Sequence, residues 1–278
     1  MLNGFNQKIH LVVILVIALG STLFLYSRPK VVVKDEEKAG KEQTVQQNNS
    51  KDSDSHAVHL SEEAEKSLSK LNADLKAAKD NSAKTTIYNQ IAEVFSKESV
   101  FDSAGHYLVK IAELSPTEAN WERAGDTYYQ AYSLALSGNK IEQSIKKTRF
   151  CYNKVLALDP QNLHAKTNLA MTYVTSDSPM TAIGMIREVL DTDPNYIPAL
   201  MSLGALSMQS NQFEKAAGRF NQVLKINPAN TNAKLGLAYS LIELDKKDEA
   251  RKIFNDVLKE DIDKVLRDEV TKTLNNLK

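Results

Sequence analysis

Cysteine is almost missing from this chain of 278 residues, since Cys151 is the only one. A single thiol can form neither an intramolecular disulfide nor a multi-cysteine metal site, so the sequence excludes both as sources of stability. An excess of charge of one sign is also missing, because 35 Lys and Arg balance 35 Asp and Glu. We therefore expect no strong attraction to polyanions and no nucleic-acid partner.

Catalytic and cofactor-binding motifs are lacking as well. The ten glycines are dispersed, and no stretch shows a phosphate-binding glycine loop, a His-Glu-x-x-His zinc helix or a nucleophile elbow. His106 and His164 stand isolated in expected helices, and Cys151 lies among apolar neighbours, so we expect structural roles for all three. The sequence predicts a protein that is not an enzyme and that holds no metal and no cofactor.

One long apolar run is present near the N-terminus. The stretch LVVILVIALGSTLFLY, from Leu11 to Tyr26, carries no charge and predicts a transmembrane helix over residues 9–27, after a short tail over residues 1–8. The alternative is a cleavable signal peptide, because Ala18-Leu19-Gly20 resembles a small-x-small cleavage site. The apolar run continues past that site, so we favour an uncleaved anchor.

The charges around this run bear on its orientation. Lys8 precedes it, and five positive residues come after it: Arg28, Lys30, Lys34, Lys38 and Lys41. Counted strictly, this asymmetry places the C-terminal domain in the cytoplasm. Acidic residues are interspersed, however, and a short N-terminal tail is typical of a signal anchor that exports the domain on its C-terminal side. We expect a single-pass protein of a bacterial inner membrane with a periplasmic domain, and the cytoplasmic orientation is the alternative.

Residues 28–60 are expected to form a disordered linker. The stretch GKEQTVQQNNSKDSDS, from Gly40 to Ser55, has one apolar side chain and cannot bury enough surface to offset the entropy of ordering. His56 and His59, at its end, lack a third metal ligand and are expected to be solvated.

A helix with one apolar face is expected over residues 61–80. Ser61 is placed to cap it, and the apolar positions recur at intervals of four and three: Ala64, Leu68, Leu71, Leu75 and Ala78. This face could dock on the next helices, which we favour, or pair with a second copy as a short coiled coil.

The decisive pattern is an internal period. Pro160, Pro194 and Pro228 recur every 34 residues, each after a Val-Leu pair in the contexts VLALDP, VLDTDPN and VLKINPAN. Proline ends helices, and 34 is the period of the tetratricopeptide repeat. Small residues are expected where paired helices cross: Ala104, Ala182, Ala216 and Ala250. With large apolar residues around them, these positions resemble the tetratricopeptide repeat family.

That resemblance implies an all-α fold, a right-handed superhelix of helical hairpins. The expected helix pairs cover residues 85–117, 118–162, 163–196, 197–230 and 231–262, and a capping helix comes last, over 263–278. The second pair opens with Trp121 and is about eleven residues longer than a regular copy. Eleven residues nearly preserve helical phase, so we expect both helices to lengthen and meet near Ser137-Gly138-Asn139.

The resemblance also implies a concave groove lined by the first helix of each pair. The positions that it carries over are polar and acidic in the N-terminal half and mostly apolar in the C-terminal half: Asn89, Glu93, Glu122, Asp126, Tyr129, His164, Thr167, Met171, Met201, Ala205, Met208, Leu235 and Tyr239. We expect a scaffold that binds an amphipathic segment of a partner protein there. The alternative is a structural protein that self-associates through the helix over 61–80 or through the repeats.

Overall fold

The computed structural model describes residues 60–174 and 178–277, and these form helices and no strand. Along the chain the helices are α2 (Glu62–Ala77), α3 (Asn81–Lys97), α4 (Phe101–Leu114), α5 (Glu118–Leu134), α6 (Gly138–Leu158), α7 (Leu163–Met171), α8 (Pro179–Thr192), α9 (Ile197–Gln209), α10 (Phe213–Ile226), α11 (Thr231–Glu243), α12 (Lys247–Val257) and α13 (Lys264–Asn276). None of them is both long and apolar enough to cross a membrane. The segments predicted as transmembrane helix and linker, residues 9–27 and 28–59, lie outside the described residues.

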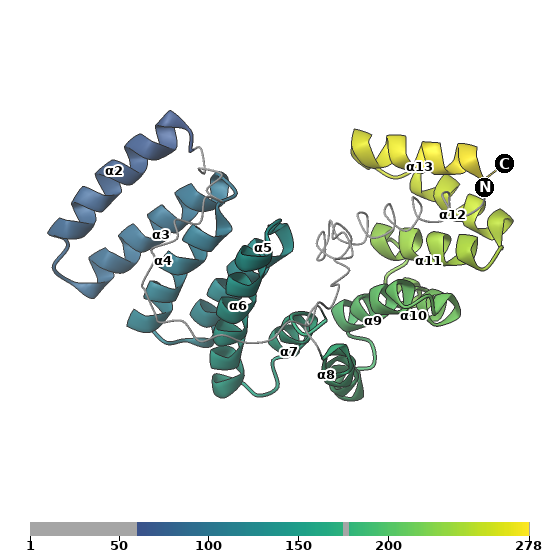
Figure 1. Ribbon diagram of the computed structural model, residues 1–278, viewed down its shortest axis with the longest axis horizontal. Coiled ribbons are helices and arrows are strands. Elements are labelled where there is room, and N and C mark those ends of the chain that lie inside the picture. The colour runs from purple at the N-terminus through teal and green to yellow at the C-terminus, as the bar shows by residue number, and fades with distance from the viewer. Residues whose placement is uncertain (1–59, 175–177, 278) are drawn as a thin grey trace, which may run out of the picture.

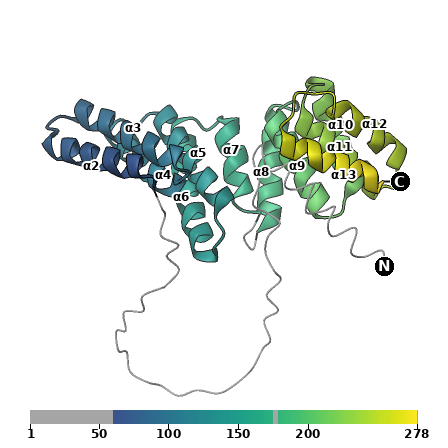
Figure 2. The ribbon, with the colours of Figure 1, turned by 90° about the horizontal axis from the view of Figure 1, so that it is seen from above.

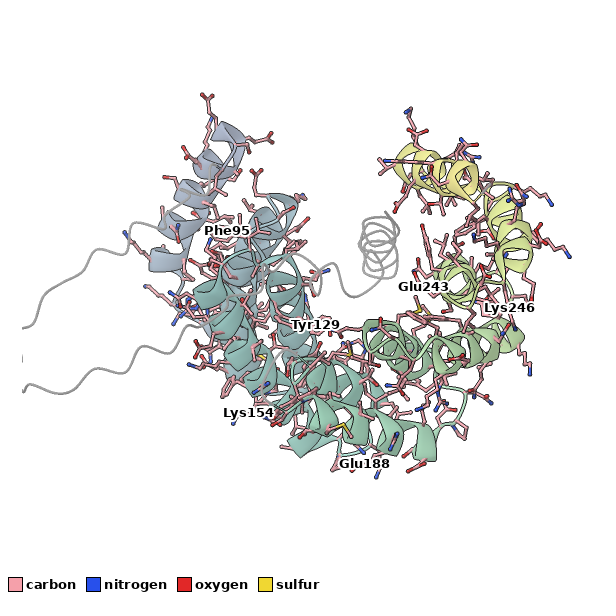
Figure 3. The ribbon with its side chains drawn as sticks, turned by 45° about the vertical axis from the view of Figure 1, so that its right-hand side comes forward. Phe95, Tyr129, Lys154, Glu188, Glu243 and Lys246 are labelled. Atoms are coloured by element: carbon pink, nitrogen blue, oxygen red, sulfur yellow. The ribbon has the colours of Figure 1, made fainter. Side chains whose placement is uncertain are left out.

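Successive helices form a curved array, with α2 at one end and α13 near the other (Figures 1 and 2). Figure 3 shows Tyr129 of α5 and Glu243 of α11 on the inner side of the curve, and Lys154 of α6 and Glu188 of α8 on the outer side. In these pairs the first helix therefore faces the concave side and the second helix faces the convex side.

Local sequence explains where the helices begin and end. Seven of them start at a side chain that accepts a hydrogen bond from a backbone N–H of the first turn: Ser61, Asp80, Thr117, Ser137, Asn162, Asn230 and Asp263. Pro160, Pro194 and Pro228 come directly after the C-caps of α6, α8 and α10. Asn211 and Asp245, 34 residues apart, have φ angles of 57° and 58° in the turns after α9 and α11. The repeat period thus extends to the turns.

The small residues predicted at the helix crossings are buried. Ala104, Ala182, Ala216 and Ala250 are all fully buried. The core around them consists of two adjoining clusters, and α9 contributes Leu203 and Leu206 to the first and Leu200 and Met208 to the second. Because neighbouring pairs share helix faces in this way, each pair depends on the next to cover its apolar side chains.

Three segments depart from the regular pair. The second pair has long helices, with 17 residues in α5 and 21 in α6, against 13 in α9 and 14 in α10. At the tip between α5 and α6, Leu136 is 92% exposed. At the N-terminal end, α2 packs on α3 with Leu68 buried, and at the other end α13 buries Val270. Docking, the favoured alternative for the helix over 61–80, is the arrangement observed in the structure.

Candidate functional site: a polar cluster on the concave side

Asp126 of α5 is the centre of a hydrogen-bonded group drawn from three helices. The Tyr152 hydroxyl of α6 donates to Asp126 Oδ1 at 2.6 Å, and His164 Nε2 of α7 lies 2.7 Å from the same oxygen. Asn168 Nδ2 of α7 donates to the Tyr152 oxygen at 3.0 Å and lies 3.1 Å from His164 Nε2. We call these four residues the Asp126 cluster. It links the second helix pair to the third.

The cluster is anchored in the core at one end and open at the other. Tyr152 is fully buried, and its ring packs over Gly125, where an added Cβ would lie 2.9 Å from it. By contrast, the side chains of His164 and Asp126 are 41% and 44% exposed. A buried tyrosine therefore holds a carboxylate and an imidazole that remain accessible to a partner.

Two further carboxylates lie beside the cluster. Asn162 Nδ2 donates to Glu118 Oε1 and to Glu122 Oε2, both at 2.7 Å. The same residue caps α7, because its Oδ1 accepts a hydrogen bond from the Ala165 N–H at 2.7 Å. One asparagine thus starts α7 and fixes that helix to the acidic face of α5.

The negative charge of this region changes the acidity of its neighbours. The hydrogen bond that Asp126 accepts from His164 raises the pKa of His164, and burial opposes this shift. The pKa of Tyr196, at the start of α9, is also raised. Burial is the main cause, and the negative charge of Glu122 is the second. Protonated His164 would form a salt bridge with Asp126, so the link between α5 and α7 strengthens as the pH falls.

The geometry also brings possible metal ligands together. Glu122, Asp126 and His164 each offer one potential ligand atom, and these three atoms lie within 4.8 Å of one another. The sequence predicts no metal; in the structure Glu122 and Asp126 lie one turn apart on α5, and His164 approaches them from α7. Closed structural zinc sites use four ligands, and these three side chains are only partly buried, so we assign no metal to them.

The N-terminal part of the predicted groove is less acidic than the sequence indicates. Arg123 Nη1 donates to Asn89 Oδ1 at 2.5 Å, which joins α5 to α3 across 34 residues. Glu93 is exposed and pairs with Lys97 at 3.1 Å on its own helix. Of the three acidic residues predicted to line the groove, Glu122 and Asp126 lie in the connected polar site and Glu93 does not.

The C-terminal part offers less apolar surface than expected. Met201 and Ala205 of α9 are partly exposed. Six other residues predicted to line the groove are buried instead: Tyr129, Thr167, Met171, Met208, Leu235 and Tyr239. These six present no open surface to a partner.

Contacts between neighbouring helices explain this burial. The Ser240 hydroxyl of α11 donates to the sulfur of Met208 of α9 at 2.9 Å, so this methionine fills the space between successive first helices. The ring of Tyr239 packs edge-on against the ring of Phe254, on α12 of the same helix pair, and the two ring centroids are 5.1 Å apart. Helix α7 ends at Met171, which belongs to the first core cluster.

Sequence reasoning missed three members of the site: Tyr152, Asn162 and Asn168. Asn162 directly precedes α7 and is a typical N-cap, and Asn168 lies one helical turn after His164. These two signals are visible in the sequence. His164 is not isolated, because it contacts Asp126 on α5, and the sequence does not reveal how α5 is rotated about its axis.

Comparison with known proteins agrees with this architecture. Residues 207–264, from α9 to the start of α13, match the tetratricopeptide repeat family model. This stretch is similar to tetratricopeptide repeats. No curated protein matches the chain.

Solved structures of tetratricopeptide repeat proteins share the fold. One from Parabacteroides merdae is 14% identical, with a TM-score of 0.55 over 78% of this chain and 86% of that chain. Yeast Tom70 is 14% identical, with a TM-score of 0.56 over 74% of this chain and 42% of that chain. The protein TTC0263 from Thermus thermophilus is 12% identical, with a TM-score of 0.50 over 64% of this chain and 91% of that chain. At these identities the likeness establishes the superhelical fold alone.

Proposed function

We propose that this chain is a membrane-anchored, non-catalytic scaffold whose concave side binds a segment of another protein. The observation that carries the proposal is the Asp126 cluster, in which a half-exposed carboxylate and imidazole are fixed by a buried tyrosine. Side chains held in this way recognise a partner at a low cost in conformational entropy. The repeat architecture supports the same role, since stacked helix pairs create extended concave binding surfaces.

The chemistry of the concave side suggests the kind of partner. Glu122 and Asp126 are acceptors for a Lys or Arg side chain, and Asn168 supplies an amide that can bind a backbone. Met201 and Ala205 provide a partly exposed apolar surface on α9. A segment with one basic and one apolar end fits these two surfaces.

Site-specific photo-crosslinking in intact cells tests this proposal. A photoreactive amino acid at Ala205, on α9, should give a discrete crosslinked band that the Asp126→Asn, Glu122→Gln double variant weakens at least about tenfold. The matched control is the same probe at Lys154, on the outer side of the curve (Figure 3). Equal crosslinking from both positions, or from neither, would contradict a concave binding site.

The anchor and its orientation belong to the same proposal. The uncharged run from Leu11 to Tyr26 supports a transmembrane segment over residues 9–27, and we extend the proposal to a periplasmic location of the helix pairs. A phosphatase fused after Lys278 should then be active, because this reporter folds only outside the cytoplasm. An inactive phosphatase fusion combined with an active cytoplasmic reporter would reverse the orientation.

Self-association through the helix over 61–80 is the alternative. Leu68 is buried against the chain's own first pair, so the face required for a coiled coil is already partly used. We therefore favour binding of a different protein.

A further inference from the structure

A cleft of about 360 Å³ lies between α8, α9 and α10. Its walls are the second helices of two successive pairs, and the last half of α9 contributes the remaining side. None of its lining residues belongs to the Asp126 cluster. A volume of this size is at the low end of ligand pockets and accommodates a few side chains of a bound segment.

The charge of the cleft is positive throughout. Arg187 of α8 and Lys215 and Arg219 of α10 line it, and no acidic residue does so among the described residues. Lys215 Nζ donates to the neighbouring Gln212 Oε1 at 2.6 Å. The side chains of Arg187 and Arg219 have no hydrogen bond or ion pair within residues 60–174 and 178–277. Two guanidinium groups from different helices are thus available to the same ligand.

The rest of the lining is apolar or weakly polar. Leu203 and Leu206 of α9 are 7% and 9% exposed, and Ile183 of α8 is partly exposed beside them. The Ser210 hydroxyl already donates to the Leu206 carbonyl at 2.8 Å. Leu203 and Leu206 are thus already buried, and Ile183 is the aliphatic side chain of this lining that a ligand can reach.

We propose that this cleft binds a protein segment in which Asp or Glu alternates with Leu, Ile or Val. The planar guanidinium groups of Arg187 and Arg219 match carboxylates in a bidentate geometry, and an aliphatic side chain of the segment packs on the partly exposed Ile183. A membrane surface also carries negative charge, but it is broad and flat and does not enter a cleft between helices. The bound segment is distinct from the basic one proposed for the concave side.

Binding of a synthetic probe tests this inference with the full chain in nanodiscs of neutral lipid. The probe is a fluorescein-labelled decapeptide that alternates Glu with Leu and Val, and the control probe has Gln in place of each Glu. Fluorescence anisotropy should show binding of the Glu probe that is at least about tenfold tighter and that weakens as salt is added. Arg187→Gln and Arg219→Gln should each weaken it about tenfold, and Lys225→Gln, outside the cleft on α10, should not.

A matched pair of glycine variants separates binding from folding. Gly218 lines the cleft and Gly184, on α8, does not, and a Cβ added at either position meets no atom within 4 Å. Gly218→Glu places a competing carboxylate in the cleft and should weaken probe binding at least about tenfold with no loss of helical signal. Gly184→Glu should bind the probe as the unaltered chain does.

Three results would overturn the assignment to the cleft. The first is equal affinity for the Glu and Gln probes, and the second is equal loss of binding in Gly184→Glu and Gly218→Glu. The third is absence of probe binding together with Arg187-dependent adsorption to vesicles that contain phosphatidylglycerol, which would assign the arginines to a lipid surface. Failure of the concave site is measured separately, by crosslinking from Ala205 and its dependence on Asp126. None of the three results above involves either residue, so the two failures can be distinguished.

Discussion

The ring of Phe220, on α10, lies directly against Gly236, on α11. A Cβ built on Gly236 would be 2.6 Å from Phe220 Cζ, closer than real Cβ atoms come to a neighbour. The same ring faces Gly204 of α9, and a Cβ built on Gly204 would also be 2.6 Å from the ring, at Phe220 Cε1. Phe220 is fully buried, so it fills a space that two glycines on successive first helices leave open.

Replacing Gly236 by alanine should therefore destabilise the repeats. The methyl group forces a buried aromatic ring out of its position, and overpacking of this kind costs about 1–3 kcal/mol. The intrinsic preference of alanine for helices offsets part of this cost, about 1 kcal/mol. The measurement is urea-induced unfolding monitored by the helical circular dichroism signal.

The control lies on the same helix as Phe220. Gly218 is exposed, and a Cβ there meets no atom within 4 Å. Gly218→Ala should raise the free energy of unfolding by about 0.5–1 kcal/mol, since only helix propensity changes. A stabilising effect at both positions would show that Phe220 moves at no cost.

The helix pairs could be predicted from sequence because their signals are local and periodic. Pro160, Pro194 and Pro228 mark helix ends, and Ala216 and Ala250 occupy the same place in successive repeats. The groove lining could not be predicted as well. Whether Met208 faces a partner or Ser240 depends on how closely α9 and α11 approach, and that distance is set by side chains 32 residues apart. The long-range partners of Asp126 escaped prediction for the same reason.

The two histidines in the described helices should titrate on opposite sides of the ordinary value near 6.5. The hydrogen bond with Asp126 raises the pKa of His164, whereas burial, aided by Lys110 and Lys147, lowers the pKa of His106. Nuclear magnetic resonance titration of the ring protons measures both. Each resonance is assigned by its disappearance in His164→Gln or His106→Gln, and the reverse order of pKa values would contradict the geometry.

A pH dependence of stability results from the raised pKa of His164. A folded-state pKa above the unfolded value means that the contribution is fully present below about pH 6.5 and is lost as the pH rises through the folded pKa. The stability difference between the unaltered chain and His164→Gln should therefore shrink on going from pH 6 to pH 8. The change should be small, because the pair is partly exposed to solvent. A difference that grows over this range would exclude the bond to Asp126 as the cause.

The docking of α2 should depend on Ser61. Its hydroxyl accepts a hydrogen bond from the Ala64 N–H at 3.2 Å and donates to Glu98 Oε1 at 2.8 Å, and its own N–H donates to Glu98 Oε2 at 3.0 Å. Ser61→Ala removes both hydroxyl contacts and should weaken α2 by about 1 kcal/mol. Hydrogen exchange should accelerate in α2 and remain unchanged in α11. Equal acceleration in both helices would indicate that α2 does not open separately.

Cys151 offers a probe of how the longest helix pair opens. It is fully buried on α6, and burial raises the pKa of its thiol to about 12. Because the thiolate is the reactive form, an aromatic disulfide reagent at pH 8 should modify the native chain far more slowly than the chain in denaturant.

The rate of Cys151 modification should rise in Tyr152→Phe, which removes the hydroxyl that joins α6 to Asp126. Tyr239→Phe, in the other core cluster, is the matched control and should leave the rate unchanged. Fast labelling of the native chain would mean that α5 and α6 separate readily, and the Asp126 cluster would then not be rigid enough to serve as a binding site.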